Sequence, residues 1–343
     1  NINRANQNMN NFKNLATIYD IIKEMPVKDI EAEAKAIAHQ NQLTKPPGAL
    51  GILEELAVFL ASWQRKTKPS LNSVQAIVFA GNHGICSQGV NPFPQDVTIQ
   101  MVENFKTGGA AINQLCEVSG ANLNIVPLSL EKPTADFTKE EAMSELELCE
   151  AMAIGAKSVN LDSNLILLGE MGIGNSTISS ALAASVFGGS VERWVGAGTG
   201  SDQKGQAHKT AVIELGIKKH GSIRDLRALQ AFGGREQAAI CGAILAARNA
   251  RIPVLLDGFI CAAAAAPLFG TSRGSLDHCL IGHLSVEPGH KLLLEAMGKS
   301  AILDLNMRLG EGTGAALALS IIRGAVACHN NMATFDSAGV SSK

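Results

Sequence analysis

Two carboxylates in glycine-rich segments are the side chains best suited to acid–base chemistry. Glu170 follows the apolar run 165–168, and Glu311 lies in Arg-Leu-Gly-Glu-Gly-Thr-Gly (308–314), directly before an alanine-rich helix. A carboxylate between glycines can approach a substrate without steric hindrance, and apolar surroundings raise its pKa until it can serve as a general base near neutral pH. A plainer interpretation of Glu311 is a first-turn carboxylate that the helix dipole favours, and spacing alone favours that interpretation.

Glycines gather directly after strand-like runs, which is typical of anion binding at the edge of a parallel sheet. The clusters start at Gly81, Gly169, Gly196 and Gly258. Glycine lets the backbone approach a phosphate, and the following helix N-terminus offers free N–H groups. Residues 175–177 are good N-cap candidates for such a helix. Any one cluster could be an ordinary strand-to-helix turn, but several together favour an anionic ligand such as a nucleotide.

Lysine and histidine near these turns add little by themselves. Lys209 follows the turn 196–200 and could pair with a phosphate, although a solvated helix lysine is the simpler interpretation. The histidines lack the H-x-x-x-H spacing of a helical metal site, so we expect no metal. The fingerprints G-x-G-x-x-G, G-x-x-x-x-G-K-[ST] and G-x-S-x-G are all absent, which argues against a standard NAD fold, a P-loop NTPase and a serine hydrolase.

The elements that must position these residues alternate along the chain. Helical spacing dominates residues 15–42 and 50–60, and an alanine-rich helix is expected over 312–328. Between them, short apolar runs alternate with helical patterns at 74–80, 123–128, 164–168, 252–256 and 279–284. This predicts an α/β protein with a Rossmann-like, doubly wound, mainly parallel sheet, and a smaller helical domain built from both chain ends. We expect N-terminal helices over 1–70, a large α/β domain over 71–300 and a C-terminal segment over 301–343.

Composition excludes several classes of protein. The 343 residues are 46% hydrophobic, 17% charged and 4% aromatic, with a formal net charge of -2. This argues against disorder, nucleic-acid binding and attachment to an anionic membrane. No apolar stretch suits a transmembrane helix, and residues 1–10 do not resemble a signal peptide. Seven scattered cysteines without a C-x-x-C pair indicate reduced thiols, so we expect a cytoplasmic protein.

Seven motifs in one order carry a resemblance to a known family. They are 45–51 (KPPGALG), 82–84 (NHG), 169–177 (GEMGIGNST), 207–209 (AHK), 253–259 (PVLLDGF), 283–288 (HLSVEP) and 307–316 (MRLGEGTGAA). In these segments the chain resembles the nicotinate-nucleotide–dimethylbenzimidazole phosphoribosyltransferases of cobalamin lower-ligand synthesis. The resemblance extends from about residue 15 to about residue 335.

The resemblance implies a reaction and an assembly. Nicotinate mononucleotide would give its 5-phosphoribosyl group to 5,6-dimethylbenzimidazole, forming α-ribazole 5′-phosphate and nicotinate with inversion at C1′. No cofactor is implied, because the donor nitrogen is already quaternary and leaves as a neutral pyridine. Members of the family are described as homodimers, each with a large α/β domain and a small domain built from both chain ends.

The resemblance also implies residue roles. Glu311 matches the general base, Glu170 a second carboxylate near the ribose and base, and Lys209 a phosphate ligand. The remaining substrate-binding residues that it implies are Gly172, Asn175, Asp257, Gly258, Ser285, Pro94, Val97, Met101 and Leu309. Asp257 would contact the ribose, and the last four would line the benzimidazole pocket, although core packing on one helix face explains these four equally well.

Two departures from the family pattern bear on the acceptor. The chain has Asn82 where the family has Asp, and its segment 91–94 also differs. A related benzimidazole or a purine-like base is therefore an alternative acceptor. A nucleotide-binding protein without catalysis is a second alternative, which Glu311, Glu170 and Lys209 count against. A nicotinamide-dependent oxidoreductase is a third, which the missing fingerprint counts against.

Overall fold

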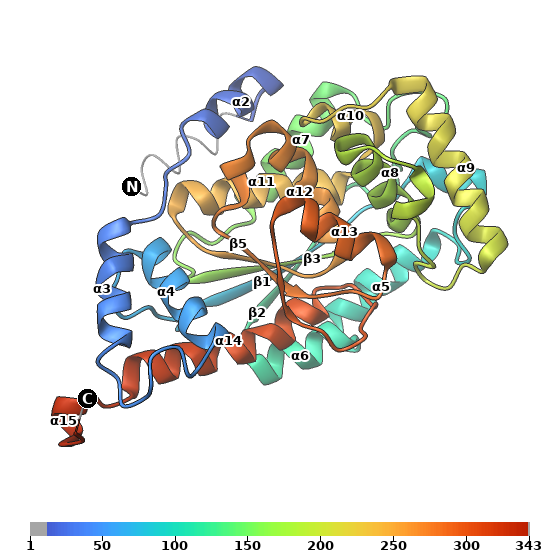
Figure 1. Ribbon diagram of the computed structural model, residues 1–343. Coiled ribbons are helices and arrows are strands. Elements are labelled where there is room, and N and C mark those ends of the chain that lie inside the picture. Colours follow the sequence, from blue (N-terminus) through green and yellow to red (C-terminus); the bar gives the residue numbers. More distant parts are fainter. Residues whose placement is uncertain (1–11, 342–343) are drawn as a thin grey trace.

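The computed structural model describes residues 12–341, so residues 1–11 and 342–343, including the expectation for 1–10, lie outside the described part. The core is a parallel sheet of six strands between two layers of helices (Figure 1). The strands are β1 (Val74–Ala80), β2 (Asn122–Pro127), β3 (Leu165–Met171), β4 (Val254–Leu256), β5 (Cys279–His283) and β6 (Ala301–Leu303). All five strand-like runs in the sequence became strands, whereas β6 was not predicted.

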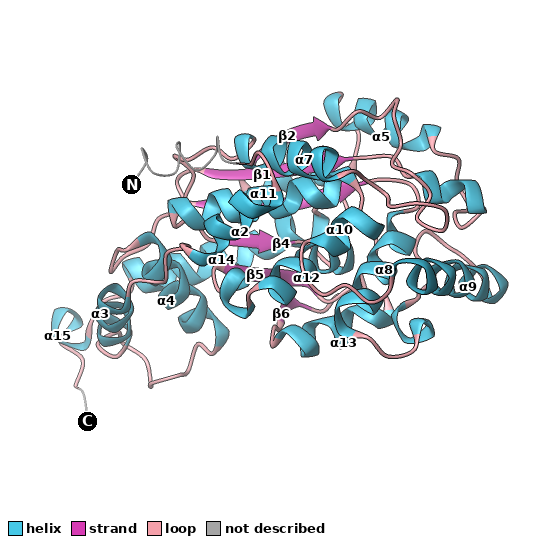
Figure 2. Cartoon of the chain, turned by 90° about the horizontal axis from the view of Figure 1, so that it is seen from above, coloured by secondary structure: helices cyan, strands magenta, loops and turns pink. Residues whose placement is uncertain are grey.

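The order of the strands determines where a ligand can bind. The order is β2-β1-β3-β4-β5-β6, and every neighbouring pair is parallel. The predicted α/β class and parallel sheet are therefore confirmed. β1 lies between β2 and β3, so the winding direction reverses there, and in such sheets ligands bind beyond the carboxyl ends of the strands at the reversal. In Figure 2 the strands point towards the side of α5, α8 and α9, and α3 and α15 lie at the opposite end.

The helices cover both faces of the sheet. They are α2 (Leu15–Lys23), α3 (Ile30–Gln40), α4 (Ile52–Gln64), α5 (Asp96–Lys106), α6 (Ala111–Ser119), α7 (Glu145–Lys157), α8 (Asn175–Phe187), α9 (Gln203–His220), α10 (Arg227–Phe232), α11 (Arg235–Ala250), α12 (Phe259–Thr271), α13 (Pro288–Met297), α14 (Thr313–Asn331) and α15 (Phe335–Ala338). Short 3-10 helices are η1 (Gly84–Gln88), η2 (Val191–Trp194) and η3 (Arg273–Leu276).

Side-chain alternation along β1 shows how the two faces form. Ile77 and Phe79 join the core cluster that contains residues of α7, α8, α11 and α12. Ala76 and Val78 join a second cluster with residues of α4, α6 and α14. Because successive side chains of a strand point to opposite faces, the apolar residues of β1 supply both cores.

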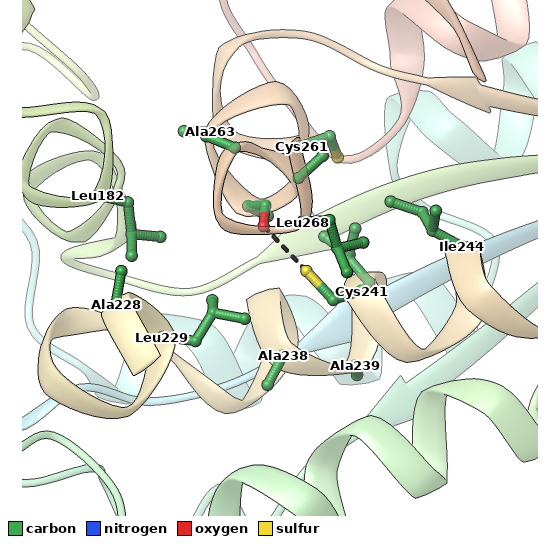
Figure 3. Packing of buried hydrophobic residues seen from close by; sticks show 14 of the residues in the cluster. Leu182, Ala228, Leu229, Ala238, Ala239, Cys241, Ile244, Cys261, Ala263 and Leu268 are labelled. Atoms are coloured by element: carbon green, nitrogen blue, oxygen red, sulfur yellow. Dashed lines mark hydrogen bonds between the residues drawn. The ribbon is translucent and has the colours of Figure 1, made fainter. Parts of the chain in front are cut away.

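Small residues let the helices over the first face approach closely. A Cβ atom at Gly155 of α7 would lie 1.8 Å from the carbonyl oxygen of Ala239 in α11, so no larger residue fits there. The alanine run of α12 is likewise buried against α11, and the Cys241 thiol donates to the Ala264 carbonyl oxygen at 2.9 Å (Figure 3). That run, residues 262–266, lies inside α12.

Segments from both halves of the chain, α3 and α4 with the C-terminal α14, lie together. Leu43 pairs with Thr334 in an antiparallel bridge, and α3 and α14 both pack on α4. The helical spacing over 15–42 belongs to two helices, because residues 24–29 around Pro26 separate α2 from α3. β6 adds to the sheet, so the expected division at residue 300 passes between neighbouring strands, and the domain boundaries stay a prediction. Of the helices in residues 12–341, none has the length and apolarity needed to cross a bilayer.

Candidate active site

A cavity opens at the carboxyl edge of the sheet. It is formed by the end of β3 and the turn that follows it, by the segments after β4 and β5, and by the two loops 196–200 and 304–312. The lining residues are Glu170, Met171, Gly172, Ile173, Asn175, Ser176, Gly198, Thr199, Asp257, Gly258, Phe259, Ile260, His283, Ser285, Glu287, Arg308, Leu309, Gly310 and Glu311. The cavity therefore lies where the topology predicts a ligand.

Most of the expected site residues gather in this cavity. Eight of them line it: Glu170, Gly172, Asn175, Asp257, Gly258, Ser285, Leu309 and Glu311. Lys209 borders it from α9, where its Nζ donates to Ser176 Oγ at 3.2 Å. Pro94, Val97 and Met101 are not among the lining residues. They lie on α5 or directly before it, so their role towards the acceptor stays a prediction.

Glu311 occupies a strained turn directly before α14. Its φ is +64°, and the flanking Gly310 and Gly312 have φ of +84° and +94°. A left-handed conformation is costly for a residue with a Cβ, and such strain is often found at functional sites. Burial raises the pKa of Glu311 to about 7; a backbone hydrogen bond from Ile112 opposes the rise and the charge of Asp257 adds to it. Glu311 can therefore exchange a proton near neutral pH.

Asp257 holds the start of α14 in place. Its Oδ2 accepts from the N–H of Gly312 at 3.1 Å, and its Oδ1 accepts from that of Ala315 at 3.0 Å. His283 Nδ1 lies 3.0 Å from the main-chain oxygen of Asp257. Asp257 thus caps a helix from another strand of the sheet and fixes the residue after Glu311. The expected ribose contact of Asp257 stays a prediction.

Glu170 lies at the end of β3 and faces the same turn. A Cβ at Gly310 would lie 2.6 Å from its Oε1, and its Oε2 accepts from the side-chain amide of Asn175. Burial raises the pKa of Glu170 to about 8, with additional contributions from the charges of Asp257, Glu236 and Glu311, against the hydrogen bond of Asn175. An empty site at neutral pH thus holds Glu170 mainly in its protonated form.

The N-terminus of α8 and Lys209 form an anion-attracting end of the cavity. Asn175 and Ser176 are the first two residues of α8 and line the cavity, so the positive end of the helix dipole is directed at it. The expected N-cap was wrong: Gly174, with a φ of +89°, is the N-cap, and no side chain caps the helix. The side chain of Asn175 instead binds Glu170.

Glu287, His283 and Arg308 also line the cavity, although we expected no role for them. Glu287 Oε1 accepts from the N–H of Gly198 at 2.9 Å and so fixes the loop 196–200. Burial raises the pKa of Glu287, in spite of the hydrogen bond from Gly198 and the nearby charge of Lys209. All three residues lie in motifs of the resemblance, which was the one signal that could have found them. Across residues 12–341, no group of His, Cys, Asp or Glu side chains is arranged to hold a metal ion.

Comparisons with known proteins show what the chain is similar to. Residues 25–340 match a family model described as "Phosphoribosyltransferase". A relative from Rhodobacter capsulatus named nicotinate-nucleotide–dimethylbenzimidazole phosphoribosyltransferase is 53% identical over 97% of this chain and 99% of its own length. A relative of the same name from Roseobacter denitrificans is 52% identical over 96% and 98% of the two chains.

Two crystal structures from Thermus thermophilus are similar to the fold. One, titled as a nicotinate-nucleotide–dimethylbenzimidazole phosphoribosyltransferase, is 36% identical with a TM-score of 0.84 and covers 92% of this chain and 100% of its own. The other, titled CobT, is 38% identical with a TM-score of 0.85 and covers 91% and 100%. At this coverage the similarity extends over most of the described fold.

Proposed function

The chain belongs to the nicotinate-nucleotide–dimethylbenzimidazole phosphoribosyltransferase family and is a phosphoribosyltransferase, and we propose that it acts on the substrates in that name. The 5-phosphoribosyl group of nicotinate mononucleotide is transferred to 5,6-dimethylbenzimidazole. The products are α-ribazole 5′-phosphate and nicotinate, with inversion at C1′. The observation that carries the proposal is Glu311, a buried carboxylate with a pKa of about 7 in a cavity that also has an anion-attracting end.

The bonds and charges of this reaction balance without a further reactant. The pyridine-type nitrogen of the neutral benzimidazole attacks C1′, and the bond from C1′ to the nicotinate ring nitrogen breaks. Its electron pair returns to that nitrogen, which leaves as a neutral pyridine. The new nucleotide would be cationic, so Glu311 takes the proton from the second benzimidazole nitrogen.

The remaining residues hold the donor in position. We assign the phosphate to the end of the cavity with Lys209 and the N-terminus of α8, supported by Gly172, Gly258 and Ser285. Glu170, which the side chain of Asn175 contacts, faces the ribose and the base. Holding both reactants in one cavity makes the displacement effectively unimolecular, which removes a large part of the barrier.

The acceptor is the least constrained part of the proposal. Leu309 is 58% exposed where it lines the cavity, which suits contact with a flat apolar ring. Asn82, which replaces the family's Asp, is buried and donates to the carbonyl oxygen of Leu130 at 3.0 Å, away from the cavity lining. Another benzimidazole or a purine-like base stays an alternative acceptor, because the segment 91–94 also differs from the family pattern.

We also propose that the protein is a homodimer, as the resemblance implies. Light scattering coupled to gel filtration tests this proposal directly. A mass near twice 35.9 kDa is expected, and a monomer at micromolar concentration would refute it.

The proposed activity is tested by product analysis. The purified protein is incubated with nicotinate mononucleotide, with and without 5,6-dimethylbenzimidazole, and the products are resolved by liquid chromatography and mass spectrometry. Acceptor-dependent release of nicotinate together with α-ribazole 5′-phosphate is expected. If folded protein releases nicotinate only with another base, the acceptor is wrong; if it binds the donor and releases none, a non-catalytic binding role is favoured.

A further inference from the structure

The turn between β3 and α8 is held by side chains from two distant segments. Ile173, in the middle of this turn, is buried, and its N–H donates to Thr98 Oγ1 of α5 at 3.1 Å. Its carbonyl oxygen accepts from His83 Nδ1 at 2.8 Å. Both main-chain polar groups of one residue are therefore bound by side chains from outside the turn.

His83 is itself held by a buried carboxylate. His83 Nε2 lies 2.6 Å from Glu236 Oε1, and neither side chain is exposed to solvent. Both ring nitrogens thus face oxygen acceptors, so His83 carries two protons when Glu236 is ionised. Burial lowers the pKa of His83, but the Glu236 carboxylate outweighs this and places it above its usual value.

Two glycines, Gly172 and Gly234, let His83 pack closely against the turn. A Cβ at Gly172 would lie 2.7 Å from His83 Cε1, and one at Gly234 would lie 2.6 Å from His83 Nε2. Gly172, the residue before Ile173, also lines the cavity. A shift of the imidazole ring would therefore move the part of the turn that faces the ligand.

We propose that Thr98, His83 and Glu236 form a clamp on Ile173 that holds the β3–α8 turn in the shape that receives the donor nucleotide. None of the three lines the cavity in the described part of the chain, so they are positioning residues. The turn that they hold contains Gly172 and joins Glu170 of β3 to Asn175 of α8. Thr98 also ties this turn to α5, the helix that carries two of the expected acceptor contacts.

The kinetic consequence of the clamp rests on the proposed function, whereas the existence of the clamp does not depend on that function. Without the clamp, the turn can leave the shape that binds the donor, and the donor must restore it on binding. The affinity for nicotinate mononucleotide should then fall more than kcat. A residue needed only for folding would instead lower the stability and the amount of active protein, with KM unchanged.

Matched variants separate these outcomes. Thr98→Val keeps the size of the side chain and removes the acceptor for the N–H of Ile173, whereas Thr98→Ser keeps the acceptor. His83→Gln places its amide near Nε2 and loses Ile173, whereas His83→Asn places it near Nδ1 and keeps a donor to Ile173. We expect a roughly tenfold rise in the Kd and KM for the donor with Thr98→Val and His83→Gln, the factor lost with one buried hydrogen bond. Thr98→Ser should stay within about threefold of wild type, and His83→Asn should bind the donor more tightly than His83→Gln.

Three measurements decide the proposal. Donor binding is measured by calorimetry, and kcat and KM are measured by nicotinate release. Hydrogen–deuterium exchange is followed in a peptide that covers residues 170–178. Faster exchange in this peptide with Thr98→Val but not with Thr98→Ser supports the clamp, whether or not the wild type releases nicotinate. Absence of nicotinate release by the wild type would overturn the proposed function alone. Equal exchange and equal donor affinity in both members of each pair would overturn the clamp, and if Thr98→Val does not fold, the His83 pair decides by the same measurements.

Discussion

Replacement of Glu311 by Gln tests the reasoning about the active site most directly. Glutamine keeps the size of the side chain but cannot take a proton, so the strained turn and the donor site should survive. General acid–base catalysis contributes roughly 10²–10⁴ to a rate, and we expect kcat to fall by that factor. At pH 4.5, where folded Glu311 is protonated, the variant should unfold at about the wild-type temperature, because the carboxyl and the amide are then both neutral.

The pH profile gives the same prediction a second, independent magnitude. With a pKa of about 7, Glu311 is about half ionised at pH 7 and about one part in eleven at pH 6. If the ionised form is the base, kcat/KM for the donor, which reports ionisations of the free enzyme, rises with pH, approaching tenfold per unit well below pH 7, and levels off above pH 8. In Glu311→Gln this rise should be absent, and the small remaining rate should not depend on this ionisation.

The assay follows nicotinate release from pH 5.5 to 9, with saturating donor and acceptor for kcat and with limiting donor for kcat/KM. Glu117→Gln, an exposed carboxylate of α6, serves as the control that should keep wild-type kinetics. Turnover of Glu311→Gln within a factor of about two of wild type would remove Glu311 from the role of base. An unchanged pH profile in the variant would assign the ionisation to another group, of which Glu170 is the first candidate.

Four further outcomes follow from the site. Glu170→Gln should raise the melting temperature at pH 8 but not at pH 4.5. The pKa of Glu170 is about 8 in the folded protein, so the protein without ligand loses stability as the pH rises from about 4.5 to 8. Calorimetry at both pH values checks this. Lys209→Met should raise the KM for nicotinate mononucleotide by roughly 10- to 100-fold with kcat within a few-fold, the worth of one charged hydrogen bond in steady-state kinetics. Asp257→Asn should cost about 1 kcal/mol of stability as a lost helix cap and lower kcat more than donor affinity, measured by unfolding and by nicotinate release. Donor binding near pH 7.5 should release protons, because the cationic ring lowers the raised pKa values of the two glutamates, and calorimetry in buffers of different ionisation enthalpy detects this.

The sequence predicted the sheet well because each strand carries its own signal. Val74–Ala80 is apolar except for Gln75 and is followed by a glycine, and both the run and the glycine were readable. β6 was missed because Ala301–Leu303 is only three residues long and becomes a strand by pairing with β5. Pro26 marked the break between α2 and α3, but the helical spacing on its two sides concealed it.

The site was predictable only where one short segment carries it. Glu170, Gly172 and Asn175 belong to one strand and its turn, so their joint presence in the cavity could be expected. The cap that Asp257 forms at Gly312 spans 55 residues and follows from packing of α14 against the sheet.

The contact of His83 with Glu236 spans 153 residues, and no spacing rule reaches so far. Pro94 and its neighbours were placed by resemblance alone, and the cavity lining does not include them.

The distribution of charge explains why this cavity suits a donor that is cationic at one end and anionic at the other. Glu170, Asp257 and Glu311 gather at one end, and the raised pKa values of both glutamates show that no cation of the described chain neutralises them there. Lys209 and the N-terminus of α8 border the same cavity, where Asn175 of α8 contacts Glu170. In the proposed reaction the donor brings a positive charge on its quaternary pyridine nitrogen, and this charge passes to the sugar as the bond to C1′ breaks. The proposal therefore assigns the carboxylates to the positive charge of the transition state, as electrostatic preorganisation requires, and Lys209 and the start of α8 to the phosphate.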